Sequence, residues 1–208
     1  MSKKKKRQWQ QSSYGLPKNH QWTARPGNKV FVADRGKAIF EVPGDWTISP
    51  HPDGGGSIRF FDKPKEDDAD MRLEFSIIYP PLRYPDTGLP IDWSGLPLTK
   101  LIEESALAGD TRGITNRGQY HQSWRDDMEM AWLEVDFHDP GEDRPAHSRL
   151  SLSRGPGVYA FITLDFWPED AYRAHKVWDC VMETLKLGGE TLNLDGSKQS
   201  PLRRLSMN

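Results

Sequence analysis

Three segments in the second half of the chain alternate apolar and polar side chains with a period of two. They are EMAWLEVDFH (129–138), HSRLSLS (147–153) and VYAFITLDF (158–166). In the first, one face carries Ala131, Leu133, Val135 and Phe137. Successive side chains of a strand point to opposite faces, and the turn sequence RGPG (154–157) joins the last two segments. The pattern predicts a long antiparallel meander.

The segment WPEDAYRAHKVWDCVMETLKLGG (167–189) has helical periodicity instead. Pro168 suits a first helical turn, Glu169 and Asp170 complement the helix dipole there, and Gly188 suits a C-terminal cap. One broad stripe consists of Ala171, Ala174, His175, Trp178, Val181, Met182 and Leu185. A helix with one apolar face must cover an apolar surface, so we expect it to lie across the preceding sheet.

Shorter elements precede the meander. Strands are predicted at 37–42, 47–49, 57–62 and 71–79, and a helix at 98–105, between Pro97 and Gly109. The order is short strands, a helix, the meander and a closing helix, without regular strand–helix alternation. We therefore expect an α+β fold with a mostly antiparallel sheet flanked by helices, and not a doubly wound parallel sheet.

Composition excludes several classes of protein. The 208 residues have a net charge of −2, which gives no bulk attraction to nucleic acid or anionic membranes. The lone cysteine, Cys180, excludes an intrachain disulfide and a multi-thiolate zinc site within one chain. No stretch approaches the ~20 consecutive apolar residues of a membrane helix, and no apolar run follows the basic N-terminus as in a secretory signal. We expect a cytoplasmic protein.

The fold elements resemble those of a known family. FEVPGDW (40–46) resembles the opening strand and turn of PsbP-like proteins, and VYAFITLDFWPEDAYRAHKVWDCVMETLKL (158–187) resembles their ending. The resemblance covers about residues 30–188 and implies an α/β/α sandwich. That fold is shared with the Ran-binding nuclear import factor and with bacterial relatives, some of which act as adaptor chaperones for type VI secretion effectors. The lysine run at the front of the chain is unlike a thylakoid targeting segment.

This resemblance, with the polar composition of the ends, predicts three parts. They are a basic, flexible N-terminal tail (1–28), a PsbP-like α+β domain (29–188) and a flexible C-terminal tail (189–208). The resemblance concerns the fold and carries no site residues.

The loop HDPGEDRPAH offers the best metal candidates. These are His138, His147, Asp139 and Glu142. However, Pro140 and Gly141 are turn residues between two predicted strands, and loops need solvated polar residues, so no metal or other cofactor is expected. The glycine run in PDGGGS (52–57) leads into a strand and not a helix, which favours a hairpin tip over a phosphate loop. The acidic run KEDDAD (65–70) is expected to be solvated.

Cys180 and His175 lie five residues apart on the predicted helix. This spacing turns the helix by about 500°, which leaves the two side chains on different sides and unable to activate each other. We expect both to serve packing. No other catalytic motif is present, so no catalytic residue is predicted.

The aromatic segment YPPLRYPDTGLPIDWSGLP (79–97) is long for a connection and carries Tyr84 and Trp93. It is either a protein interface or a cover for a sheet edge. Trp132, on the polar face of its strand, raises the same question. We expect a non-enzymatic protein-binding or adaptor protein that uses Tyr84, Trp93 and Trp132.

Two alternatives remain open at this stage. One is an enzyme or a metal- or ligand-binding protein with a site near residues 138–147. The other is a nucleic-acid-associated factor that acts through the basic run Lys3 to Arg7, with Trp9 available for stacking.

Overall fold

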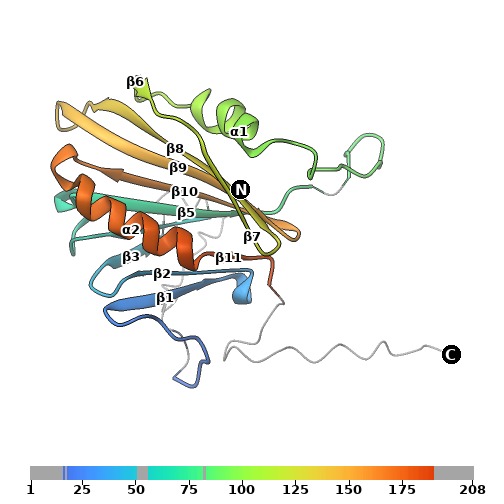
Figure 1. Ribbon diagram of the computed structural model, residues 1–208, viewed down its shortest axis with the longest axis horizontal. Helices are drawn as coiled ribbons and strands as arrows, with labels where there is room; N and C mark the ends of the chain where they lie inside the picture. Colours follow the sequence, from blue (N-terminus) through green and yellow to red (C-terminus); the bar gives the residue numbers. More distant parts are fainter. Residues whose placement is uncertain (1–15, 17, 51–55, 82, 190–208) are drawn as a thin grey trace, which may run out of the picture.

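A computed structural model describes residues 16, 18–50, 56–81 and 83–189. Its main sheet has eight strands in the order β3-β4-β5-β10-β9-β8-β6, with β7 also paired to β8 (Figure 1). All neighbouring strands are antiparallel. The strands are β3 (Thr47–Pro50), β4 (Ser57–Phe61), β5 (Met71–Ile78), β6 (Ile114–Arg117), β7 (His121–Arg125), β8 (Met128–Asp139), β9 (Arg144–Gly155) and β10 (Val158–Phe166). The predicted meander is confirmed as β8-β9-β10.

A smaller sheet consists of β1 (Asn28–Ala33), β2 (Ala38–Pro43) and β11 (Lys186–Leu187), with β2 in the middle. Only β2 was predicted. Residues 186–187 were expected to end the closing helix, but they pair with Ile39 and Ala38 because the helix stops at Thr184. Gly188 has a φ of +76° and follows this strand, where a Cβ would meet Pro156.

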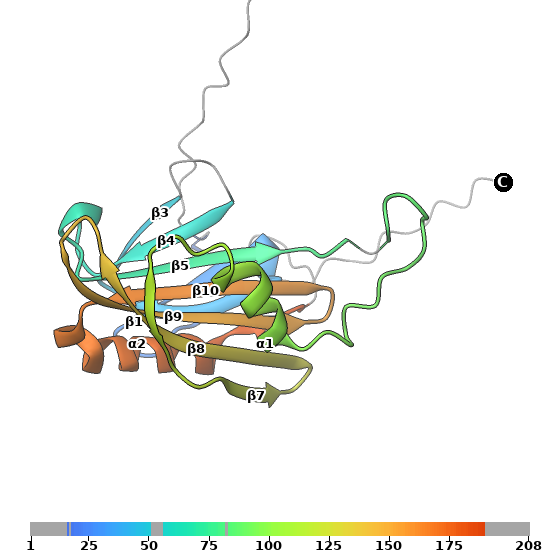
Figure 2. The same cartoon turned by 90° about the horizontal axis from the view of Figure 1, so that it is seen from above.

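Two helices flank the main sheet. On one face, α2 (Ala171–Thr184) follows a 3-10 turn, η4 (Pro168–Asp170), and packs against β2 and β10. On the other face, α1 (Leu98–Leu101) continues as a π-helical segment, η3 (Ile102–Leu107), over β8 and β9 (Figures 1 and 2). Two short 3-10 turns, η1 (Asp34–Gly36) and η2 (Glu66–Asp68), complete the elements. The architecture confirms the predicted α+β sandwich.

The two faces of the sheet bury separate cores. Alternation along β10 sends Ile162 and Leu164 toward α2, together with Phe40 of the small sheet and Trp178 of the helix. The opposite alternation along β8 sends Leu133 and Val135 toward α1. Trp178, at 1% exposure, and Leu185, at 0%, show that α2 lies flat on its apolar surface, as predicted.

The predicted stripe of α2 was wrong at one edge. Ala171 and His175 are exposed, whereas Val177, which the stripe omitted, is buried. The helix packs against β2 as well as β10, so its buried face is rotated toward the small sheet. Pro168 and the acidic residues after it placed the start of the helix, whereas Gly188 follows β11 and does not cap the helix. The rotation of the helix is fixed by this second packing partner.

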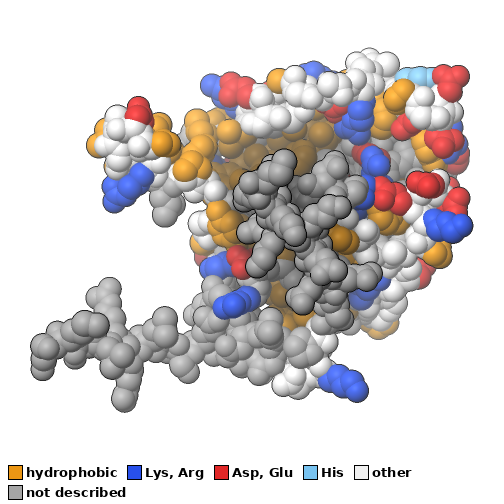
Figure 3. Space-filling model, turned by 180° about the vertical axis from the view of Figure 1, so that it is seen from behind, with side chains coloured by type: hydrophobic (Ala, Val, Ile, Leu, Met, Phe, Trp, Pro, Cys, Tyr) orange, Lys and Arg blue, Asp and Glu red, His pale blue; other side chains and the backbone are white. Residues whose placement is uncertain are grey.

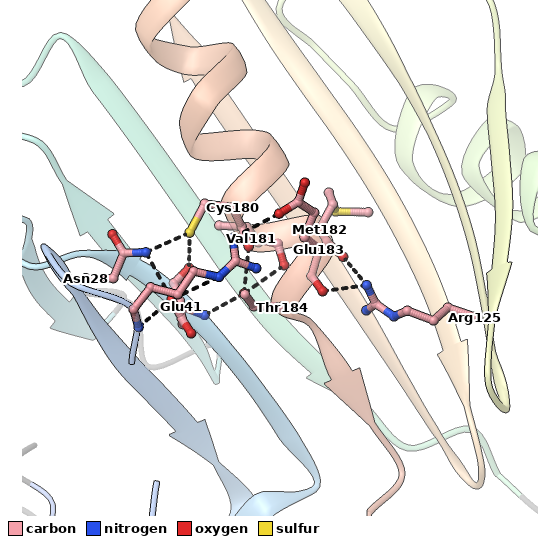
Figure 4. Close-up of polar contacts among 9 residues, drawn as sticks. Asn28, Glu41, Arg125, Cys180, Val181, Met182, Glu183 and Thr184 are labelled. Carbon is pink, nitrogen blue, oxygen red and sulfur yellow. Dashed lines mark hydrogen bonds and ion pairs between the residues drawn. The ribbon is translucent and has the colours of Figure 1, made fainter. Parts of the chain in front are cut away.

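Polar contacts hold the C-terminal turn of α2 in place (Figure 4). Arg125, at the end of β7, donates to the carbonyl oxygens of Met182, Glu183 and Leu185. These carbonyls have no partner within the helix, so the guanidinium acts as a cap. On the other side of the helix, Thr184 Oγ1 accepts a hydrogen bond from the backbone N–H of Glu41 in β2, at 2.9 Å.

Every helix in the described part of the chain is too short or too polar to span a lipid bilayer.

Candidate functional site: an apolar groove and the arm beside it

An apolar groove of about 350 Å³ lies between the α1–η3 segment and the main sheet. Its floor comes from Leu152 of β9 and from Tyr159 and Phe161 of β10, and its wall includes Leu101 and Ala106. It forms because the short helical segment covers β8 and β9 but leaves this part of β10 open. Figure 3 shows hydrophobic side chains gathered in a hollow on this face of the molecule.

The connection 79–97 begins with residues that line this groove, and we call it the arm. It projects from the body of the molecule (Figure 2). Six large hydrophobic residues are exposed among those that the structure describes. Four of them lie at the start of the arm or within it: Ile78 (43%), Tyr79 (51%), Tyr84 (50%) and Leu89 (61%). Ile78 and Tyr79 line the groove, and Tyr84 and Leu89 extend this exposed apolar surface along the arm.

Internal hydrogen bonds give the arm its shape. The backbone N–H of Tyr84 donates to the carbonyl of Leu89, and that of Gly88 donates to the carbonyl of Tyr84, both at 2.9 Å. Gly88 has a φ of +67°, which the turn requires and glycine accepts readily. Arg83 Nη1 also donates to the carbonyl of Gly88, at 2.9 Å. The tip of the arm is thus a closed turn.

Trp93 anchors the base of the arm. Its indole Nε1 donates to the carbonyl of Pro81 at 2.7 Å, and its own carbonyl accepts hydrogen bonds from Arg154 and Tyr159. Trp93 also packs against the core under α1. Of the residues expected to bind a partner, Trp93 therefore lines the groove while Tyr84 stands exposed on the arm.

Tyr79, at the mouth, donates its phenolic O–H to Asp34 Oδ2 of η1. Partial burial and this hydrogen bond to a carboxylate raise the pKa of Tyr79 to about 12. The hydroxyl therefore stays a neutral donor at physiological pH, and it fixes the ring at the edge of the groove.

Trp132 lies on the other face of the sheet. Its ring stacks on His121 with centroids 4.0 Å apart, and it meets Trp178 of α2 edge-on at 5.6 Å. The structure thus shows what covers Trp132, and it does not bring this residue together with Tyr84 and Trp93.

The four metal candidates of the 138–147 loop do not converge. His138 contacts Asp143 at 2.9 Å, and Asp139 Oδ1 accepts hydrogen bonds from the backbone N–H groups of Gly141 and Glu142. Asp139 therefore shapes the hairpin turn, as its loop position suggested.

His147 instead meets two acidic residues of β8 that the sequence analysis did not single out. Ligand atoms of Glu134, Asp136 and His147 all lie within 4.8 Å of one another. Burial opposes ionisation of Asp136, but hydrogen bonds from Asn116 and His147 lower its pKa below the usual value. A signal for this grouping was available, because a hairpin turning at 140–143 sets Asp136 opposite His147.

Cys180 and His175 have separate surroundings. Asn28 Nδ2 donates to Cys180 Sγ at 3.2 Å, and burial together with the Glu41 charge raises the pKa of the thiol. His175 is exposed and contacts Asp179 at 3.4 Å, which corrects its expected packing role. Residues 3–7, Trp9 and most of the glycine run lie outside the described residues, as does all but Gly189 of the C-terminal tail.

Comparisons with known proteins agree on family and fold. The model of the Alr1449 family matches residues 29–191. The uncharacterized protein alr1449 of Nostoc sp. is 33% identical over 192 residues, covering 90% of this chain and 93% of the relative.

Two solved structures share the fold at low sequence identity. Cyanobacterial PsbP (CyanoP) from Synechocystis sp. PCC 6803 has a TM-score of 0.55 and 15% identity, covering 79% of this chain and 95% of CyanoP. A protein from Bacteroides thetaiotaomicron has a TM-score of 0.53 and 14% identity, covering 79% of this chain but only 50% of that protein.

Proposed function

This chain belongs to the Alr1449 family and has a PsbP-like fold, and from that premise we propose that it is a non-enzymatic protein-binding protein. The proposed site is the groove together with the arm, and the proposed occupant is an apolar segment of a partner protein. One observation carries the proposal: exposed Ile78 and Tyr79 line an apolar groove, and the arm that continues from them exposes Tyr84 and Leu89 as well.

The size of the groove suits one or two apolar side chains. Its volume of about 350 Å³ is at the small end of the range for ligand sites, and its lining is almost entirely hydrophobic. Full burial of one Leu or Phe side chain there contributes about 1.5–3 kcal/mol. Such anchors carry much of the binding energy at protein interfaces.

The arm favours a protein over a small apolar molecule. A small molecule would fill the groove but leave Tyr84 and Leu89 in water. A partner that continues past the groove covers these side chains as well. Tyr84 and Leu89 have side chains of the type that protein interfaces bury. Exposed apolar groups gathered in this way mark interaction surfaces.

The arm also needs little ordering on binding. Its turn is closed by the Tyr84–Leu89 and Gly88–Tyr84 hydrogen bonds, and its base is fixed through Trp93. A binding element that already has its bound shape loses less conformational entropy on association.

The test is selection of peptides from a random displayed library on the immobilised protein, followed by affinity measurement with the selected peptides. We expect enrichment of peptides with two or more large apolar residues. Ser105→Trp, which places an indole in the groove from an exposed wall position, should weaken binding at least tenfold, whereas Ser105→Ala should not.

A second pair of variants examines the arm. Leu89→Ser should weaken peptide binding several-fold, while Tyr172→Ser, which removes another exposed hydrophobic side chain but on α2, should leave it unchanged. The proposal is wrong if no apolar peptide is enriched. It is also wrong if neither Ser105→Trp nor Leu89→Ser changes the affinity for the selected peptides. Binding of a hydrophobic dye that Ser105→Trp blocks, without peptide binding, would instead indicate a small apolar ligand.

The cytoplasmic location and a nucleic-acid role for residues 3–7 stay predictions from the sequence.

A further inference from the structure

We propose that Glu134, Asp136 and His147 bind one divalent first-row transition-metal ion, with Zn²⁺ as the test ion. The three residues lie on the α2 face of the main sheet, on β8 and β9, opposite the face that forms the groove. This site is independent of the proposed protein-binding function.

The spacing of the ligand atoms suits a metal ion. His147 Nδ1 lies 2.7 Å from Asp136 Oδ1 and 4.0 Å from Glu134 Oε1. Four-coordinate Zn²⁺ with bonds of about 2.0–2.1 Å holds its ligand atoms about 3.3 Å apart. The observed distances bracket this value, so small side-chain rotations bring all three atoms onto one ion.

The remaining oxygen atom of each carboxylate is already held from outside the cluster. Arg149 Nε donates to Glu134 Oε2 at 2.7 Å, and Asn116 Nδ2 donates to Asp136 Oδ2 at 2.9 Å. Each carboxylate thus turns its other oxygen toward His147. Donors of this kind orient ligands in known metal sites.

The backbone holds the ligands on a rigid frame. Asp136 and His147 are directly opposite each other in the β8–β9 ladder, and Glu134 precedes Asp136 by two residues on the same face. The imidazole of His147 stacks on Phe166 with ring centroids 5.4 Å apart. A site built on paired strands keeps its geometry better than one on a loop.

Solvent reaches the cluster, so an ion can enter it. The exposed fractions of the side chains are 25% for His147, 34% for Glu134 and 36% for Asp136. Three protein ligands leave at least one coordination position for water or another molecule, as at zinc sites that take part in chemistry.

The donor set selects the class of ion. Two carboxylate oxygens and one imidazole nitrogen suit Zn²⁺ and neighbouring divalent ions, whereas Mg²⁺ prefers oxygen alone and Cu⁺ prefers sulfur. The Arg149 guanidinium offsets part of the carboxylate charge, so we expect weaker binding than at a structural zinc site with four protein ligands.

The experiment is a Zn²⁺ titration of the full chain, with any affinity tag removed, against a coloured chelator. We expect one equivalent bound by the wild type. His147→Phe, which keeps a ring against Phe166 but removes the nitrogen, should weaken binding at least tenfold, and Asp136→Asn should do the same. His138→Ala, in the same hairpin but paired with Asp143, should change affinity less than twofold.

Several results would overturn the site. They are no Zn²⁺ binding by the wild type, binding that survives both His147→Phe and Asp136→Asn, or binding that is lost with His138→Ala. Thermal unfolding without metal checks that each variant is folded, and Glu134→Gln replaces any variant that is not. A zinc-dependent rise in melting temperature that these same substitutions remove would support the assignment.

Discussion

Arg125 Nη1 donates a hydrogen bond of 2.6 Å to the backbone carbonyl of Glu183, which lies 58 residues further along the chain (Figure 4). The same guanidinium reaches the carbonyls of Met182 and Leu185. A side chain from the β7–β8 hairpin therefore caps the closing helix and connects it to the edge of the main sheet that lies away from β3.

Loss of this cap should destabilise the fold. We expect Arg125→Ala to lower the free energy of unfolding by about 1.5–3 kcal/mol, the range for hydrogen bonds that involve a charged group. Arg117→Ala removes an exposed ion pair with Glu103 and should cost about 1 kcal/mol or less. Urea unfolding of the three proteins measures the difference, and equal losses for both variants would contradict the capping role.

The rotation of α2 toward the small sheet gives a second prediction. Val177→Ala should lower the free energy of unfolding by about 1–2 kcal/mol because it removes buried methyl groups. His175→Ala, on the exposed edge of the helix, should stay within about 0.5 kcal/mol of the wild type. Urea unfolding of both variants measures the two effects. A larger loss for His175→Ala than for Val177→Ala would show that the helix lies with its other edge against the sheet.

The ion pair of Asp110 with Arg112 should make the free energy of unfolding fall at acidic pH. Hydrogen bonds from Arg112 hold the pKa of the Asp110 carboxyl below its usual value of 3.8. Because the folded-state pKa is the lower one, the stabilisation is present above the unfolded-state value and is lost as the pH falls through the folded-state value.

Replacing this carboxylate removes that contribution. Asp110→Asn should be less stable than the wild type at pH 7 and should lose less stability below about pH 4. Asp86→Asn, the same change on the exposed arm, is the control and should keep the acid response of the wild type. Urea midpoints measured from pH 7 down to pH 2 test this, and parallel curves for Asp110→Asn and the wild type would exclude the mechanism.

Much of the fold followed from sequence periodicity. Strands β8 to β10 have clear alternation and tight turns, and the proline and acidic residues before α2 placed its start correctly. In β1, by contrast, every residue is of intermediate burial, so its pattern is weak, and β11 has only two residues. Such strands are defined by their pairing with β2, which follows β1 directly along the chain but is distant in the sequence from β11.

The candidate sites were predicted less completely for the same reason. Tyr84 and Trp93 stood out as aromatics in a long connection, but the groove needs Leu152 and Phe161 from two other strands. The proposed metal ligands Glu134 and Asp136 are not among the residues, such as His138 and Glu142, that the sequence pattern favoured. The ligands of this site lie within the strands, where cross-strand register and not proximity in sequence brings them together.

The pairing of Leu187 with Ala38 affects when the protein can complete its fold during translation. Strand β2 leaves the ribosome before the covering helix α2 and its neighbour β11, which are translated about 130 to 150 residues later, and contacts this remote are slow to form. Phe31, Phe60 and Phe75 can contact Phe40 early, but the part of the apolar surface around β2 that α2 covers stays exposed until translation passes Leu187. During that interval, the nascent polypeptide is a natural client for chaperones.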